Sequence, residues 1–426
     1  MVKYIKKAPP QKAQDVSAVE ETAHRMLADI KENGDAAVSR YAAELDKWQG
    51  GEFRVTEDQI AAAEASLPET FKEDFEFCHR QITQFAQRQL ETLTEFECET
   101  EPGIVLGQKQ IPVTNIGCYI PGGKYPLVAA ASMSVGVART AGVEHIIGCA
   151  PPRDGKEMYA PTLYALHKAG ADEIYVLGGI QAMASMAFGC VGMRAVDLIT
   201  GPGNAYVAEA KRQLYGTVGI DLLAGPTEIL IIADETADPE LVATDLLGQA
   251  EHGPDSPAWL VTTSRPIGEA VLAHVEEQLK TLPTREIAAP AWRDHGEIAV
   301  VSDIDEAVRL SDEYAPEHLE LMTGRDDEYL SRLKNYGSLF VGEEATVAYG
   351  DKGIGTNHTL PTSGASRYTG GLWVGKFIKT VTYQRLKPAA SRAIAPVLAR
   401  QCEVEGMLAH GITCDARFAR YEGANE

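Results

Sequence analysis

Apolar residues recur three and four positions apart over residues 15 to 92, a spacing that places them on one face of a helix. From about residue 100 the pattern changes to short β-rich runs that alternate with helical ones. Such alternation is typical of parallel strands joined by right-handed crossover helices. The sequence therefore predicts an α/β protein with a helical N-terminal region.

The alternation continues with short connections as far as about residue 314. The expected strands are 113–119, 146–149, 173–177, 196–200, 228–233, 258–262 and 297–301. The expected helices are 129–141, 160–169, 205–214, 241–250, 266–283 and 304–314. This order predicts two α/β units and a helical tail after Tyr383.

Length and charge narrow the class of protein. The 426 residues are 45% apolar, which is enough for two or more domains with sizeable cores. The chain has 61 acidic and 39 basic residues, and its formal charge of -22 would repel nucleic acid and anionic membranes. No signal peptide or membrane-length apolar run is apparent. We therefore expect a cytoplasmic protein without nucleic-acid or membrane partners.

The seven cysteines are scattered and form no C-x-x-C pair, so reduced thiols are expected. Cys118 and Cys149 lie in apolar, strand-like segments. A thiol could act as a nucleophile in aldehyde oxidation. A buried, inert cysteine is the more common state, and we favour it for both.

Two segments contain candidate metal ligands. In Gln249-Ala-Glu-His252 a helix would carry two ligands three residues apart on one face. Asp351, His358 and His410 complete a possible metal and acid-base constellation. A lone histidine on an amphipathic helix is more often a surface or core residue, so this spacing leaves both interpretations open.

Longer motifs surround these residues: Gly225-Pro-Thr-Glu228, Ala315-Pro-Glu-His318 and Gly355-Thr-Asn-His358. Together they resemble the histidinol dehydrogenase family over roughly residues 15 to 410. That family comprises zinc enzymes that oxidise a primary alcohol to a carboxylate with two NAD. The resemblance implies two Rossmann-like parallel-sheet units, one of them discontinuous, and a homodimer in which a C-terminal tail reaches the partner subunit.

The resemblance also implies domain boundaries and site residues. The expected domains are a helical region 1–92, a first α/β domain 93–118 plus 228–382, a second α/β domain 119–227, and a dimerisation tail 383–426. The implied zinc ligands are Gln249, His252, Asp351 and His410. The implied NAD contacts are Tyr119, Gln181 and Asn204. The implied substrate contacts are Thr227, Gln249, His252, His318, Asp351, His358, Glu405 and His410.

Glu317 and His318 match the acid-base pair of the family. An imidazole can accept the hydroxyl proton near neutral pH, so His318 is the expected base for alcohol oxidation. The aldehyde must then be hydrated, and Glu317 is the expected group that deprotonates water. Read without the resemblance, Ala315-Pro-Glu-His318 is more typical of the start of a helix.

The dinucleotide site has no G-x-G-x-x-G signature. Pro121-Gly-Gly-Lys124 and Gly201-Pro-Gly-Asn204 each follow a β-like run, and the second precedes a helix. Either could present backbone amides to a phosphate. Most Pro-Gly pairs only mark turns, and that alternative stays open.

The tail favours one branch of the family. Its Thr413, Asp415, Arg417 and Tyr421 resemble the paralogous branch that includes sulfopropanediol 3-dehydrogenase. We therefore expect (R)-2,3-dihydroxypropane-1-sulfonate as substrate, with L-histidinol as the alternative, since Glu405 matches a substrate contact of histidinol oxidisers. Arg417 or Arg367 could hold the sulfonate, or either could be a surface arginine. A non-catalytic zinc-binding scaffold and an enzyme that stops at the aldehyde or ketone are the remaining alternatives.

Overall fold

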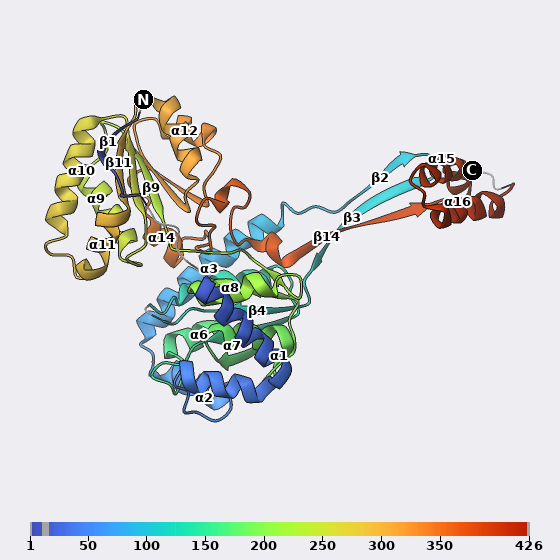
Figure 1. The fold of residues 1–426 in the computed structure, drawn as a ribbon, viewed down its shortest axis with the longest axis horizontal. Coiled ribbons are helices and arrows are strands. Elements are labelled where there is room, and N and C mark those ends of the chain that lie inside the picture. The colour runs from blue at the N-terminus through green and yellow to red at the C-terminus, as the bar shows by residue number, and fades with distance from the viewer. Residues whose placement is uncertain (1, 11–16, 124, 424–426) are drawn as a thin grey trace.

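The computed structural model describes residues 2–10, 17–123 and 125–423. Figure 1 shows two α/β units beside each other and a long arm that projects away from both. Within the described residues no helix combines the length and apolar character needed to cross a membrane. The parallel α/β architecture predicted from the sequence is confirmed.

The first unit contains a six-stranded sheet in which only β1 is antiparallel to its neighbour. The strand order is β1 (Lys3–Lys6), β11 (Gly296–Val300), β10 (Ala258–Thr262), β9 (Ile229–Ala233), β12 (His318–Met322), β13 (Ser338–Val341). Its helices are α9 (Pro239–Ala250), α10 (Arg265–Gln278), α11 (Arg285–His295), α12 (Ile304–Tyr314), α13 (Asp326–Arg332) and α14 (Val347–Lys352). Two separate apolar clusters cover the sheet, because alternate residues of β9 point to opposite faces.

The second unit contains a five-stranded, fully parallel sheet. The strand order is β6 (Glu173–Val176), β5 (His145–Ala150), β4 (Asn115–Tyr119), β7 (Leu198–Thr200), β8 (Gly219–Ile220). Its helices are α4 (Ala129–Ala131), a π-helical turn (Ser132–Gly136), α5 (Val137–Thr140), α6 (Ala160–Ala169), α7 (Gly179–Phe188) and α8 (Ala205–Leu214). Strands β4 and β5 are buried along almost their whole length, as a sheet covered on both faces requires.

The N-terminal helices belong to this second unit. They are α1 (Ser17–Leu45), α2 (Glu57–Ser66) and α3 (Glu69–Leu90). Met26, Ile30 and Val38 of α1 share an apolar cluster with α7 and β5. Gly34 has a φ of 53°, so α1 is broken at this glycine.

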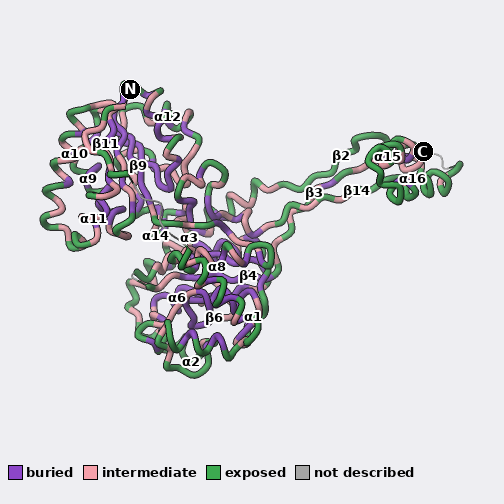
Figure 2. Tube along the Cα trace, viewed as in Figure 1, coloured by how far each residue is buried: buried purple, intermediate pink, exposed green. Residues whose placement is uncertain are grey.

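The arm is a three-stranded antiparallel sheet followed by two packed helices (Figure 1). Its elements are β2 (Phe96–Glu101), β3 (Ile104–Pro112), β14 (Ile378–Leu386), α15 (Pro388–Val404) and α16 (Leu408–Arg420). Two 3₁₀ turns, Ala365–Arg367 and Val374–Phe377, precede β14. Figure 2 shows that the arm is mostly exposed, in contrast to the buried strands of both units.

Some boundaries differ from those expected. Residues 93–118 do not join the sheet of β9: they form β2 and β3 of the arm, and most of β4 of the second unit. β1 lies in the region 1–92 expected to be helical, and β14 extends into the tail 383–426. Local periodicity identifies a strand but not the sheet it joins, because β1 pairs with β11 nearly 300 residues away.

Candidate active site

The candidate catalytic residues gather at the amino ends of β9 and β12. Thr227 lies two residues before β9. Glu317 and His318 lie where β12 begins. α9 runs back along the sheet, so its last turn brings Gln249 to the same edge. Open α/β sheets usually bind ligands at their carboxyl ends, so only the folded chain reveals this placement.

Glu317 is held in a fixed position. It is 5% exposed, and its Oε2 accepts hydrogen bonds from Thr227 Oγ1 at 2.5 Å and from the backbone N–H of Glu228 at 3.0 Å. Burial raises the pKa of Glu317, and the neighbouring His318 opposes the rise. A carboxylate with a raised pKa is a better acceptor for a proton from water.

His318 has one ring nitrogen anchored and the other free. Its Nδ1 lies 3.0 Å from the carbonyl oxygen of Glu228, which can only accept, so Nδ1 carries a proton. Nε2 is buried without a hydrogen-bond partner in the described chain and lies 3.7 Å from Asp351 Oδ1. Burial alone would lower the pKa of His318, but the charges of Glu317 and Asp351 raise it.

Three of the four predicted metal ligands lie around this histidine. Gln249 Nε2 donates to Thr227 Oγ1 at 2.5 Å, which turns the amide oxygen Oε1 away from Thr227. His252 stands in the turn just after α9, with its backbone N–H donating to Gln249 O at 3.2 Å. Burial alone would raise the pKa of Asp351, but His318 and His358 lower it to about 2.

The fourth predicted ligand, His410, lies elsewhere. It is exposed on α16, at the far end of the arm in Figure 1, as is the predicted substrate contact Glu405 after α15. Within the described residues no group of three or more His, Cys, Asp or Glu side chains could hold a metal ion. One chain alone therefore presents only part of the predicted site.

His358 faces a cavity of about 250 Å³ beside this cluster. Its Nδ1 donates to the carbonyl oxygen of Asp351 at 3.2 Å, and its buried Nε2 has no partner among the described residues. The neighbouring Asn357 donates to Met133 O at 2.7 Å and so ties this segment to the π-helical turn of the other unit. His358 itself lies in the loop between α14 and the 3₁₀ turn Ala365–Arg367.

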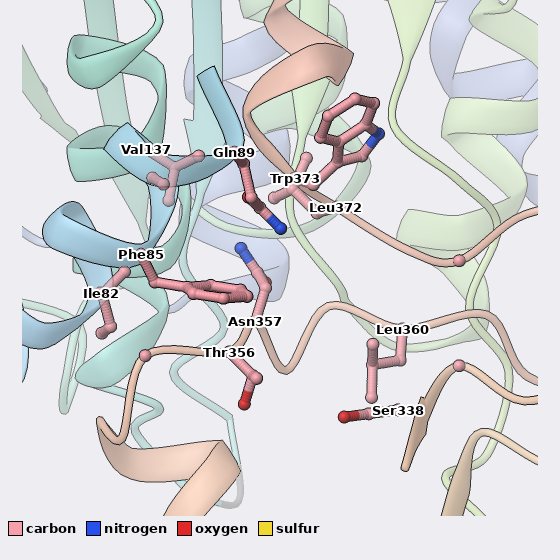
Figure 3. A pocket seen from close by; sticks show the side chains of 14 residues that line it. Ile82, Phe85, Gln89, Val137, Ser338, Thr356, Asn357, Leu360, Leu372 and Trp373 are labelled. Carbon is pink, nitrogen blue, oxygen red and sulfur yellow. The ribbon is translucent and has the colours of Figure 1, made fainter. Parts of the chain in front are cut away.

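A second, smaller cavity of about 130 Å³ marks the seam between the two units. Figure 3 shows Phe85 and Gln89 of α3 approaching Asn357, with Trp373 beside them. The segment that carries His358 thus lies against α3 of the second unit.

A large cavity of about 760 Å³ runs along the carboxyl ends of the five-stranded sheet. All three predicted NAD contacts, Tyr119, Gln181 and Asn204, line it, and so does His252. The cavity therefore connects the predicted cofactor residues to a predicted metal ligand.

The two Pro-Gly segments also line this cavity. Gly201 has a φ of 117°, and a Cβ there would stand 2.0 Å from Tyr119 O, so only glycine fits. Asn204 caps α8, and its Oδ1 accepts the N–H groups of Tyr206 and Val207 at 3.1 Å each. The N–H groups of Tyr206 and Val207 at the start of α8 are therefore occupied by Asn204. Of the other segment, residues 121–123 line the cavity and Lys124 lies outside the described residues.

Several other predictions are decided by the geometry. Cys118 and Cys149 are fully buried, and burial raises the pKa of both thiols, that of Cys118 to about 12, which argues against a nucleophilic role. All seven cysteines are free, as predicted.

Arg367 donates to the carbonyl oxygens of Gly364 and Glu313, so its guanidinium is already engaged. The alternative that Ala315-Pro-Glu-His318 begins a helix is wrong, since His318 opens β12.

Sequence reasoning missed four residues of these sites. Glu228 is 4% exposed, its carbonyl anchors His318, and burial with the charge of Glu317 raises its pKa to about 8. Asp46 contacts Gln181 from 135 positions away, and Lys211 pairs with Asp221 beneath the Gly201 loop. No local motif indicates contacts made at such separations.

The model of the histidinol dehydrogenase family matches residues 10–418. The chain belongs to the histidinol dehydrogenase family. It is 51% identical over 423 residues to a histidinol dehydrogenase homolog of Shouchella clausii (strain KSM-K16), covering 99% of this chain and 100% of that protein. It is 48% identical over 422 residues to the sulfopropanediol 3-dehydrogenase of Ruegeria pomeroyi (strain ATCC 700808 / DSM 15171 / DSS-3), covering 99% and 97%.

The fold agrees with this assignment. The crystal structure of histidinol dehydrogenase from Elizabethkingia anophelis superposes with a TM-score of 0.90 at 36% identity, covering 98% of this chain and 95% of that one. The histidinol dehydrogenase family consists of NAD-dependent oxidoreductases that act on CH–OH donors, generally bind zinc and are generally homodimeric. The chain is therefore an NAD-dependent oxidoreductase acting on CH–OH donors.

Proposed function

We propose that this dehydrogenase oxidises a small polar primary alcohol to the carboxylate in two steps, with an aldehyde between them and two NAD consumed. The observation that supports this most strongly is the pair formed by Glu317 and His318. The two groups are buried side by side, with His318 Nδ1 3.5 Å from Glu317 Oε2. Two different proton acceptors at one place suit two successive oxidations.

His318 is the proposed base of the first step. Its Nδ1–H is fixed on the Glu228 carbonyl, so Nε2 is the atom that can take the hydroxyl proton of the substrate. The C–H hydride leaves to the co-substrate NAD, and the alcohol carbon becomes an aldehyde. The hydride goes to NAD and the hydroxyl proton to His318, so both hydrogens removed from the alcohol are accounted for.

Glu317 is the proposed base of the second step. It takes one proton from the water that adds to the aldehyde carbonyl. The resulting hydrate anion loses a second hydride to a second NAD, and the carboxylic acid so formed releases its proton to solvent to give the carboxylate. Thr227 gives its only hydroxyl proton to Glu317, so it can offer a substrate only an oxygen lone pair. Its proposed substrate contact is therefore the acceptance of a hydrogen bond.

The residues present fit a zinc ion in their chemistry. One imidazole, one carboxylate and one amide oxygen, from His252, Asp351 and Gln249, suit a borderline metal. Gln249 Nε2 donates a hydrogen bond to Thr227, so Gln249 Oε1 is the amide atom left to bind zinc. When bound, zinc would supply Lewis-acid polarisation of the substrate oxygen and would offset the Asp351 charge that raises the pKa of His318.

The proposed site is completed by a second copy of the chain. His410 and Glu405 stand on the arm, away from this chain's own Gln249 and Asp351 (Figure 1). The arm carries large apolar side chains that are at least 36% exposed: Phe96, Leu106, Leu386, Val397, Leu398, Val404, Met407, Leu408, Ile412 and Phe418. Such a surface is typical of an interface, so we propose that each arm reaches the partner subunit and supplies these two residues there.

The proposed substrate is (R)-2,3-dihydroxypropane-1-sulfonate, converted to sulfolactate. The greater identity to the sulfopropanediol 3-dehydrogenase than to the histidinol dehydrogenase of known structure supports it. Arg367 donates to Glu313 O in its own unit, whereas Arg417 lies on the arm and donates to Thr413 O of its own helix at 2.9 Å. Because the arm is proposed to reach the partner's site, Arg417 is the proposed partner of the sulfonate. L-histidinol is the second candidate, because Glu405 is kept on the arm.

The substrate is tested by measuring NADH formation by the zinc-loaded protein with each alcohol at matched concentrations. We expect turnover of the sulfonate and two NADH per molecule oxidised. A ratio of one would show that oxidation stops at the aldehyde or ketone. Turnover of L-histidinol alone would replace the proposed substrate, and no NADH with either would overturn both.

The two bases are separated by paired variants. His318→Asn removes the imidazole acceptor and should lower alcohol oxidation by about 100-fold or more, the usual contribution of a general base. Glu317→Gln keeps the shape of the side chain and should slow aldehyde oxidation more than alcohol oxidation. Either variant with wild-type rates in both half-reactions would remove that residue from the mechanism.

A further inference from the structure

The half-buried carboxylate of Asp46 fixes the orientation of the Gln181 amide in the large cavity. Asp46 Oδ2 accepts hydrogen bonds from Gln181 Nε2 at 2.9 Å and from the backbone N–H of Gly178 at 3.0 Å. Asp46 lies at the end of α1, whereas Gly178 and Gln181 form the start of α7. The contact thus joins two elements that are far apart in the sequence.

The assignment of the two amide atoms follows from the acceptor. The oxygen that receives the Gly178 N–H has only lone pairs to offer Gln181, so the amide NH₂ must face Asp46. Gln181 Oε1 must then point the other way. Gln181 is 1% exposed, and its Oε1 is buried without a hydrogen-bond partner among the residues that the structure describes.

The neighbouring backbone donors are already used, so Gln181 Oε1 is available to accept a hydrogen bond from a ligand. The N–H of Gly179 is taken by Tyr119 Oη at 3.3 Å, so the first two amides of α7 already have acceptors. A Cβ on Gly178 would meet Asp46 Oδ1 at 2.8 Å, so glycine is needed for the carboxylate to approach this closely. A buried acceptor without a partner is costly unless a ligand satisfies it.

We propose that Asp46 is a positioning residue for the cofactor: it holds Gln181 so that Oε1 accepts a hydrogen bond from a donor group of the dinucleotide. This inference rests on the proposed contact between Gln181 and NAD. Both side chains line the cavity of about 760 Å³ that is also lined by His252. The donor is the carboxamide NH₂, the adenine 6-amino group or a ribose hydroxyl, which share this chemistry.

The test is a titration of zinc-loaded dimer with NAD in the absence of alcohol, followed by calorimetry, so turnover is not required. Asp46→Leu removes the acceptor, frees the amide to rotate and should weaken NAD binding by about 10-fold, as expected for a hydrogen bond. Asp46→Asn is the matched control. It keeps an oxygen in the same place and should bind within about twofold of wild type.

A double-variant cycle separates positioning from a structural role. Gln181→Ala should weaken NAD binding by about 10-fold, and Asp46→Leu in that background should add less than about twofold, because its effect passes through Gln181. An equal loss in both backgrounds, or wild-type affinity in Asp46→Leu, would overturn the inference. Wild-type protein that binds no NAD would instead contradict the proposed cofactor contacts as a whole.

Two analogues identify the donor. Nicotinamide hypoxanthine dinucleotide lacks the adenine amino group, and 3-acetylpyridine adenine dinucleotide lacks the carboxamide NH₂. The analogue that binds equally to wild type and Gln181→Ala is the one that lacks the donor met by Oε1. If both lose about 10-fold on that substitution, as NAD does, the donor is a ribose hydroxyl. If NAD itself loses nothing, Gln181 accepts no bond and the inference fails.

Discussion

The Gly201 loop, beside the cavity proposed to bind NAD, stands on a buried ion pair, and breaking that pair should destabilise the second unit. Lys211 Nζ donates to Gly201 O at 2.9 Å and pairs with Asp221, whose side chain is fully buried. Asp221 also accepts the N–H groups of Gly201 at 2.8 Å and Leu222 at 2.7 Å. The perturbation we consider is Lys211→Met, which removes the cation but fills most of its volume.

The loss of unfolding free energy depends on how well the remaining Asp221 carboxylate is stabilised. Removing one member of a buried pair costs about 3 to 5 kcal/mol, because the other charge stays buried without its counter-ion. Asp221 keeps two backbone donors, so we expect the lower end, about 3 kcal/mol. For a domain of this size that corresponds to a fall in Tm of about 6 to 12 °C.

The assay is thermal and urea unfolding followed by circular dichroism at one fixed protein concentration, since dimerisation contributes to stability. Arg212→Met is the matched control on the same helix. Arg212 is 50% exposed in its pair with Glu209, so its loss should cost less than about 1 kcal/mol. Lys211→Met with Asp221→Asn should recover much of the loss by removing the orphaned charge. Equal stability of the Lys211 and Arg212 variants would refute the reasoning.

Three further predictions concern Glu228, Gly201 and Cys118. The folded-state pKa of Glu228 is raised to about 8 from 4.5, so the stability of wild type relative to Glu228→Gln should fall as pH rises from about 5 through about 8, as measured by urea unfolding. A pH-independent difference would contradict this burial effect. Gly201→Ala should cost at least about 2 kcal/mol and weaken NAD binding, because its Cβ would strike the Tyr119 carbonyl, whereas Gly51→Ala meets no atom within 4 Å and should be neutral in both assays. Cys118→Ser should retain kcat, because a buried thiol with a pKa of about 12 is not a nucleophile, and loss of turnover in a folded variant would restore that role.

The sequence by itself determined the alternation of strands and helices. Its periodicity places β5, α6, β10 and α12 within about a residue of their observed ends, because each buries a face of regular spacing. It also indicated the residue types that metal binding and proton transfer require. The motifs around Thr227 and His318 indicated the family before any contact was known.

Only the tertiary structure decided which sheet each strand joins and which side chains meet. β4 and β9 are both short apolar strands, and nothing local separates the sheet of one from that of the other. The same limit applies to Asp46, whose contact with Gln181 spans 135 residues. Such contacts depend on how elements pack, and local spacing carries no information about packing partners.

The arm shows most clearly what the sequence determines and what only the tertiary structure decides. The sequence placed His410 and Glu405 in a helical tail, but their distance from Asp351 within one chain is a property of the extended β3 and β14 pair (Figure 1). Two antiparallel strands of nine residues each carry the tail outward because their backbone hydrogen bonds hold them extended. Residue types determined the chemistry available to this protein, and long-range pairing decided where in space each group acts.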